Sequence, residues 1–186
     1  MRLFEQAWPE GEYRFFQLGF VVNDLLSAAA AWARVVGVGP FHVLPPIEQP
    51  CTYRGTASAI NIQVAVAQAG PVQIELIKQH CHRPSVFRDW STGNVSGLHQ
   101  LCTVTADYEG KKAHYERLGY EVASEIDMGD YRVAYINTAD DFGFYTEILA
   151  QNAQLLGLLA NIADTCAHWD GTDPVRLLTR DGYRVP

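Results

Sequence analysis

Long apolar runs, clustered basic charge and closely spaced cysteines are all missing from this 186-residue chain. No apolar run approaches the ~20 residues that a membrane-spanning helix needs, and residues 1–9 lack the apolar centre of a secretory signal. The Lys and Arg residues are scattered and the formal net charge is −7, which excludes the usual basic surface for nucleic acid. We therefore expect a cytoplasmic protein with no membrane and no nucleic-acid partner.

The four cysteines are far apart and form no C-x-x-C pair. Separated thiols of this kind are typical of a reduced cytosolic protein, so no disulfide framework is predicted. The composition, with 48% hydrophobic and 19% charged residues, is that of an ordinary globular domain with a sizeable core.

Two stretches repeat one pattern. Residues 16–24 (FQLGFVVND) and 99–107 (HQLCTVTAD) each predict a strand that has a Gln near its start and an Asp at its end, and Gln17 and Gln100 are 83 positions apart. A helical run follows each Asp, which is a favourable helix N-cap, and each run stops at a glycine. The chain is therefore predicted to contain a duplicated module.

Each copy also ends in an apolar strand that carries one acidic residue, Glu75 in VQIELI and Glu147 in FYTEIL. A carboxylate in a buried strand is costly unless it is paired, hydrogen-bonded or bound to metal. One such residue in each copy indicates a shared site. The alternative is a polar plug, in which an Arg or the two Gln side chains neutralise each Glu.

The element pattern predicts an α+β fold built from two β-α-β-β-β modules and a C-terminal helix. The predicted boundaries are an N-terminal arm at 1–13, a first module at 14–78, a linker at 79–96, a second module at 97–150, and a C-terminal helix and polar tail at 151–186. Pro45, Pro46 and Pro50 predict a loop within the first module.

Three further motifs support a family resemblance: GVGPF at 37–41, QIELI at 73–77 and GLH at 97–99. Together with the duplicated module they resemble the vicinal oxygen chelate superfamily, which includes glyoxalase I, methylmalonyl-CoA epimerase, extradiol dioxygenases and bleomycin-resistance proteins. The resemblance covers roughly residues 15–150. It implies that the two modules pair into a cup-shaped mixed sheet.

The resemblance also implies metal ligands at Gln17, Glu75, Gln100 and Glu147. Relatives usually have His where this chain has Gln100, and strand alternation predicts that the neighbouring His99 points to the opposite face. An amide oxygen is a harder and weaker ligand than imidazole. The expected cofactor is therefore one divalent ion (Mn, Mg, Zn, Ni or Co) or, because of Gln100, none.

Glu75 and Glu147 are the predicted catalytic residues. With a metal ion, one of them would move a proton beside a carbonyl that the ion polarises. Without a metal ion, burial and mutual repulsion would raise the pKa of one carboxyl group and leave a working acid/base pair.

Four residues are predicted to bind substrate: Tyr145, Cys102, His42 and Tyr135. Tyr145 shares a strand face with Glu147, and Cys102 shares one with Gln100. The competing interpretation is that the aromatic residues and the small thiol belong to the core. His80 and His82 are interpreted as solvated loop residues.

The first functional hypothesis is an isomerase, epimerase or lyase that moves a proton beside the carbonyl of a small, mostly apolar substrate. The second is a protein of the bleomycin-resistance type that sequesters a small molecule without chemistry. The resemblance also implies a homodimer. Glutathione is disfavoured as cosubstrate because no Arg and Lys cluster is evident, and dioxygenase iron is disfavoured because no His occupies a ligand position.

Overall fold

The computed structural model describes residues 12–89 and 97–186, so most of the predicted arm at 1–13 and the end of the predicted linker at 79–96 lie outside the described residues. The strands are β1 Glu12–Val21, β2 Phe41–Val43, β3 Ile47–Tyr53, β4 Thr56–Ala69, β5 Val72–Gln79, β6 Gly97–Thr105, β7 Val122–Asp127, β8 Arg132–Ile136, β9 Tyr145–Ala150, β10 Val175–Thr179 and β11 Gly182–Arg184. The helices are α1 Leu25–Val36, the 3-10 turn η1 Val86–Arg88, α2 Tyr108–Arg117, α3 Ala139–Phe142 and α4 Ala153–Ala167.

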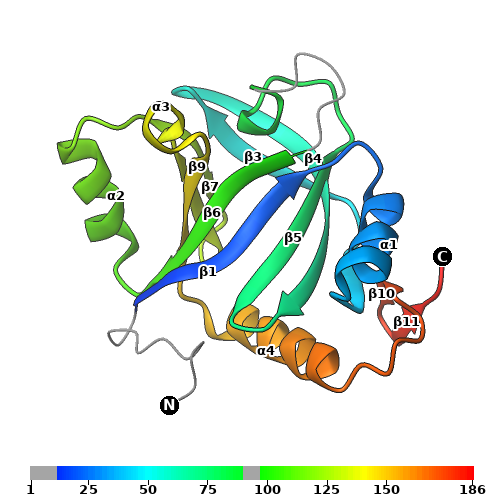
Figure 1. Ribbon diagram of the computed structural model, residues 1–186. Helices are drawn as coiled ribbons and strands as arrows, with labels where there is room; N and C mark the ends of the chain where they lie inside the picture. Colours follow the sequence, from blue (N-terminus) through cyan, green and yellow to red (C-terminus); the bar gives the residue numbers. More distant parts are fainter. Residues whose placement is uncertain (1–11, 90–96) are drawn as a thin grey trace.

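One curved mixed sheet forms the body of the molecule (Figure 1). Its strands follow the order β4-β3-β7-β8-β9-β6-β1-β5, and a further pairing between β5 and β4 closes them into a ring. Each predicted module supplies half of this ring, and α1 and α2 lie outside it. The α+β prediction of a cup made from two repeated modules is confirmed.

The two copies meet at the antiparallel pair β1 and β6, which run side by side in Figure 1. Gln17 lies opposite Cys102, and Gly19 lies opposite Gln100. These two pairings are equivalent under the 83-residue repeat, so the junction has the approximate two-fold symmetry of the sequence. The opening strands of both copies therefore contribute to one central region.

Pro45 and Pro46 lie in a loop, as predicted, but Pro50 lies in strand β3. β3 pairs with β4 along its whole length but with β7 only at Thr52 and Tyr53. Pro50, which lacks a backbone N–H, lies in the part of β3 that has one neighbouring strand, where a proline is tolerated. Pro50 thus lies in a part of the ring where a strand is hydrogen-bonded on one side only.

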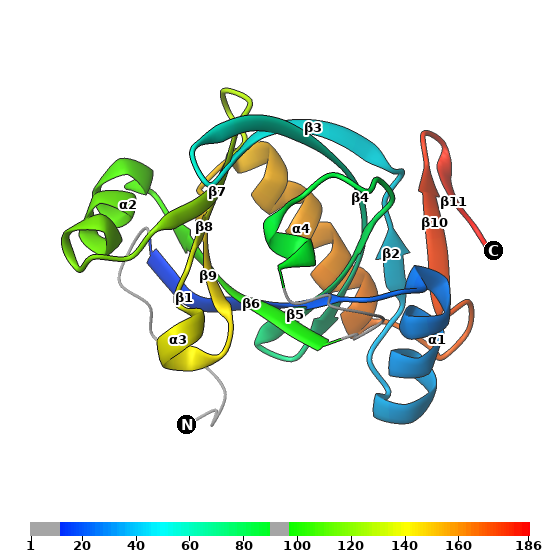
Figure 2. The same ribbon diagram turned by 90° about the horizontal axis from the view of Figure 1, so that it is seen from above.

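Helix α1 follows its sequence signals. The Asp24 side chain accepts a hydrogen bond from the Ser27 N–H at 2.7 Å, and Gly37 ends the helix with φ 76°. The buried residues Leu25 and Ala29 face the outer side of the sheet, in a cluster with Phe41 and Leu76. The predicted C-terminal helix, which follows the second module, corresponds to α4 and lies across one opening of the ring (Figure 2).

The C-terminal segment is partly strand, where a polar tail was predicted. β10 pairs in parallel with β2, outside the closed ring, and β11 pairs with β10. Val175 is buried against the outer cluster that contains α1, whereas the exposed β11 has the polar composition expected of an edge strand. Within residues 12–89 and 97–186, no helix is long and apolar enough to cross a membrane.

Candidate active site inside the ring

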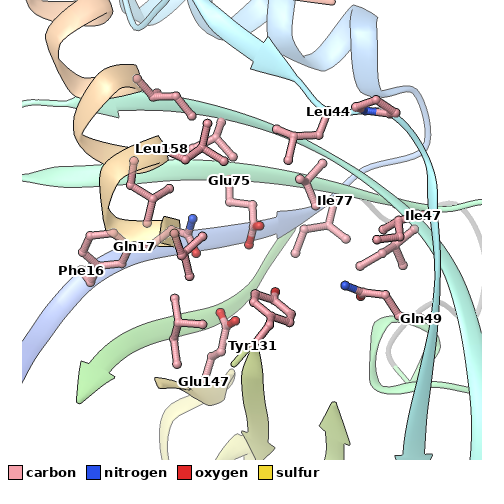
Figure 3. Close-up of a pocket in the computed structure, with 18 of the residues that line it drawn as sticks. Phe16, Gln17, Leu44, Ile47, Gln49, Glu75, Ile77, Tyr131, Glu147 and Leu158 are labelled. Carbon is pink, nitrogen blue, oxygen red and sulfur yellow. The ribbon is translucent and has the colours of Figure 1, made fainter. Parts of the chain in front are cut away.

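A cavity of about 470 Å³ lies inside the ring and under α4 (Figure 3). Its walls are mainly aliphatic and aromatic, and the polar exceptions are two Gln side chains, two Glu side chains and tyrosine hydroxyls. The lining residues are Phe16, Gln17, Leu44, Pro45, Pro46, Ile47, Gln49, Ile62, Val64, Val66, Glu75, Ile77, Phe87, Met128, Tyr131, Tyr135, Glu147, Leu149, Leu155, Leu158, Leu159 and Ile162. A small, mostly apolar molecule fits such a cavity.

Glu75 and Glu147 reach this cavity from opposite halves of the ring. Glu75 projects from β5 and Glu147 from β9, and Figure 3 shows the two carboxylates directed toward the same space. The side-chain nitrogen of Gln100 connects them, because Nε2 lies 3.2 Å from Glu75 Oε2 and 3.2 Å from Glu147 Oε2. Glu147 is only 5% exposed, whereas Glu75 is half-buried.

Burial raises the pKa of both carboxyl groups, and the charge of Glu147 adds to the shift of Glu75. For Glu75 the desolvation caused by burial is the main cause, and the charge of Glu147 raises the pKa further, to well above its ordinary value. For Glu147 burial raises the pKa to about 7, although hydrogen bonds from Cys102, Gln100 and Tyr135 oppose this. The pair therefore holds a proton near neutral pH.

His99 lies on the inner side of the sheet, so the prediction that it points to the opposite face is wrong. The cause is a β-bulge: Gly19 pairs with Gln100 and Phe20 with Leu98, which leaves His99 as an extra residue in β6. The His99 ring, 2% exposed, packs against the rings of Phe87 and Tyr145.

Both ring nitrogens of His99 face carbonyl oxygens. Nε2 lies 3.0 Å from the Val86 backbone oxygen, and Nδ1 lies within hydrogen-bond reach of Gln100 Oε1. Burial lowers the pKa of His99 below its ordinary value, although these two contacts partly oppose the shift. A neutral imidazole carries one ring proton, and with that proton on Nδ1 the ring donates to Gln100 Oε1. His99 thereby fixes the Gln100 amide with its NH₂ group toward the carboxylates.

Gly19 leaves the space that the Gln100 side chain occupies. A Cβ atom at position 19 would lie 2.4 Å from Gln100 Cδ, far inside contact distance. Gly19 pairs with Gln100 in β6 on one side and with Glu75 in β5 on the other, so it lies between these two residues of the site. A residue without a side chain is therefore required here by the packing of Gln100 rather than by a turn.

The four side chains predicted as metal ligands do not fit a divalent ion as they are arranged. The Gln17 amide nitrogen donates to Gln73 Oε1 at 2.9 Å, and the Gln100 oxygen is turned to His99. An N–H group, which cannot ligate a cation, lies between the two carboxylates. Among the described residues, no group of three or more His, Cys, Asp or Glu side chains could hold a metal ion.

The structure separates the four predicted substrate-binding residues. Tyr135 lines the cavity. Tyr145 is buried in the hydrophobic core, and its hydroxyl donates to Asp89 Oδ2 at 2.6 Å. Cys102 is fully buried in the same core, beside Glu147. His42 lies in β2, between β4 and β10 and beyond the lining residues. These three residues are not among the lining residues, because strand alternation predicts a face but not the depth of a side chain.

Three features of the cavity carried no clear sequence signal. Tyr131 and Gln49 lie together in the lining, and a hydrogen bond from Gln49 lowers the otherwise strongly raised pKa of Tyr131. Gln49 is 5% exposed, and its Oε1 has no hydrogen-bond donor among the described residues. Four apolar side chains of α4, outside the repeat, cover the cavity. The apolar pattern of α4 predicted that the helix packs on another surface, but it did not predict that this surface is the cavity.

The sequence profile described as "Glyoxalase/Bleomycin resistance protein/Dioxygenase superfamily" matches residues 16–135. The chain belongs to this superfamily. The match begins at Phe16 within β1 and ends at Tyr135 in β8, so the resemblance is confirmed. A search of curated proteins found no match.

Solved structures with low sequence identity to this chain share its fold. A methylmalonyl-CoA epimerase variant of Streptomyces coelicolor, in complex with 2-nitronate-propionyl-CoA, is 19% identical with a TM-score of 0.53, covering 75% of this chain and 97% of that one. The Mycobacterium tuberculosis methylmalonyl-CoA epimerase is 15% identical with a TM-score of 0.52, covering 84% and 97%. A hypothetical protein of Bacillus halodurans is 12% identical with a TM-score of 0.52, covering 77% and 96%.

Proposed function

We propose that this superfamily member is an enzyme that moves a proton next to a carbonyl group, as an isomerase, epimerase or lyase. The observation that carries the proposal is the pair of carboxylates joined through Gln100 at the wall of an apolar cavity. One carboxylate removes the proton from the carbon beside the carbonyl, and the other, in its acid form, delivers a proton to the substrate.

The pKa shifts give the two Glu residues different expected roles. Glu75 is half-buried and lines the cavity, whereas Glu147 is 5% exposed and receives more hydrogen bonds that favour its charged form. Since the charge of Glu147 raises the pKa of Glu75, the proton is held by Glu75 when Glu147 is ionised. In the state with Glu147 ionised, Glu147 is the base and Glu75, which holds the proton, is the acid.

The cavity lining indicates the substrate class. Its aliphatic walls favour an apolar carbonyl compound, and the volume of about 470 Å³ suits a small molecule. Gln49 Oε1 is a buried acceptor that lacks a donor among the described residues, so a substrate with a hydroxyl or N–H group on that side satisfies it. The epimerase neighbours with a CoA ligand support proton transfer as a chemistry for the fold.

Solvent deuterium exchange tests the proposal. Phenylacetone, an apolar ketone, and methylmalonyl-CoA are incubated with the protein in D₂O, and deuterium at the carbon beside the carbonyl is followed by mass spectrometry. We expect incorporation with at least one probe, and a loss of at least roughly a hundredfold in Glu75→Gln and Glu147→Gln. Glu116→Gln, on the exposed side of α2, is the matched control. Equal exchange in all variants contradicts the acid/base assignment.

A ligand-sequestering protein is the second candidate, because the cavity walls are mainly apolar and α4 covers the cavity. Binding of a flat aromatic probe such as 2-naphthol, displaced by no carbonyl compound and without any deuterium exchange, would favour this candidate. A homodimer stays a prediction for either function, and sedimentation velocity measures it.

A further inference from the structure

Gln100 occupies the position where relatives are expected to have a metal-binding His. Its side chain donates hydrogen bonds to the two carboxylates, which a metal ligand does not do. Its amide nitrogen lies 3.2 Å from an oxygen of each carboxylate, one from each half of the ring. An NH₂ group has two N–H bonds, which matches the number of acceptors. The side chain thus connects Glu75 to Glu147 as an ion between them would, but without a charge.

Three contacts hold the Gln100 side chain in place. The amide oxygen accepts a hydrogen bond from His99, whose other nitrogen lies 3.0 Å from the backbone oxygen of Val86. The missing side chain at Gly19 provides the space for Gln100 Cδ. Gln100 itself is 0% exposed, so water does not compete for its hydrogen bonds.

We propose that the Gln100 amide, positioned by His99, takes the place of a metal ion and holds Glu75 and Glu147 in the geometry for proton transfer, so that this site works without a divalent cation. The inference rests on the proposed function, because it concerns the same carboxylates. A neutral amide supplies no Lewis acid. The substrate carbonyl is then activated by the protonated carboxyl group alone.

Metal binding is the direct test. Mn²⁺ is titrated into the purified protein and free Mn²⁺ is measured by electron paramagnetic resonance, with Zn²⁺ binding measured by calorimetry. We expect no stoichiometric binding by the wild-type chain. Gln100→His places an imidazole beside two carboxylates, so we expect it to gain one ion per chain and to lose that ion when Glu147→Gln is added.

Two metal results overturn the inference. Wild-type protein that binds one Mn²⁺ per chain, and loses it in Glu147→Gln, shows that the amide turns its oxygen inward and ligates the ion. A folded Gln100→His variant that binds neither Mn²⁺ nor Zn²⁺ shows that Gln100 does not occupy the place of an ion.

The deuterium-exchange assay, run in EDTA, tests the role of the amide. We expect wild-type exchange to survive EDTA and Gln100→Leu to lower it at least tenfold with no metal gained. Gly19→Ala, which crowds Gln100 without removing it, provides a second variant, and Gln63→Leu, outside the cavity lining, is the control. His99 does not line the cavity among the described residues, so His99→Phe should lower kcat and leave KM unchanged.

The two proposals fail in different ways. No exchange by any form of the protein removes the proposed function, whereas exchange that EDTA abolishes and Mn²⁺ restores removes only the inference. Full exchange in Gln100→Leu also overturns the inference while leaving the two carboxylates as the acid/base pair.

Discussion

The two halves of the ring carry the same strand pattern but use their Gln residues differently. His99 and Gln100 in the second half correspond to Phe16 and Gln17 in the first under the 83-residue repeat. In the second half His99 holds the amide oxygen, and the amide nitrogen lies between the carboxylates. In the first half Phe16 has no hydrogen-bonding group, and Gln17 turns to Gln73 instead.

The orientation of each amide thus follows the hydrogen-bonding groups around it, His99 beside Gln100 and Gln73 opposite Gln17. Both strands are irregular near this position, with register shifts between Tyr13 and Gln17 and between Gly19 and Phe20. The irregularity lets two consecutive side chains face inward in each half, because Phe16 and Gln17 both line the cavity. The strand beside each Gln differs too, because Gln17 pairs with Gln73 whereas Gln100 pairs with Tyr145. A symmetric scaffold thus has an asymmetric site through differences at both neighbouring positions.

The largest expected effect concerns the pH dependence of stability. The pKa of Glu147 is raised to about 7 in the folded chain, above its value of about 4.3 in an unfolded one. The folded state therefore binds more protons between these values, and the free energy of unfolding falls as the pH rises through this window. Glu147 alone accounts for a fall on the order of 3 kcal/mol between pH 5 and 8. Urea unfolding measures it; a wild-type curve as flat as that of Glu147→Gln would contradict it.

The next effect comes from making the second half resemble the first. His99→Phe removes the donor to the Gln100 oxygen and keeps an aromatic ring against Phe87 and Tyr145. Loss of amide orientation should lower deuterium exchange roughly tenfold to a hundredfold, because small displacements of catalytic groups are costly. An unchanged rate in a folded variant would mean that the amide needs no support from His99.

A smaller effect is expected from the Gln pair of the first half. Gln73→Leu removes the acceptor of the Gln17 amide nitrogen and leaves a buried donor without a partner. This should cost about 1–2 kcal/mol of stability. The double variant Gln17→Leu with Gln73→Leu should recover part of this loss. Deuterium exchange should change little in the single or the double variant. This result would distinguish the structural role of Gln17 and Gln73 from the role proposed for Gln100.

The smallest effect is expected from the reverse change, Phe16→His, which gives the first half a polar residue beside Gln17. Exchange should change less than about threefold, since Gln17 contacts Gln73 rather than the carboxylates. Nitrogen-15 NMR of the Gln17 side-chain amide would show whether it leaves Gln73 for the new ring. A large loss of exchange would place Gln17 in the catalytic machinery.

The repeat allowed much of the fold to be predicted, because helix caps, turns and apolar alternation are local signals. The convergence of Glu75 and Glu147 followed from the repeat as well, since equivalent strands of a closed sheet meet at its centre. The inward position of His99 could not be predicted, because a bulge depends on which residue lies opposite in another strand. β3 and β10 were not predicted, because prolines and polar residues obscure the alternating pattern in strands that have few hydrogen-bonded neighbours.

Helix α4 lies outside both modules, yet its Leu155, Leu158, Leu159 and Ile162 form one side of the cavity. One part of the cavity lining is therefore encoded outside the strands that carry the two carboxylates. Substitutions along one helical face can reshape the space for a ligand while the carboxylates and their amide bridge keep their positions. Altered ligand preference can thus arise here without any change to the duplicated strands.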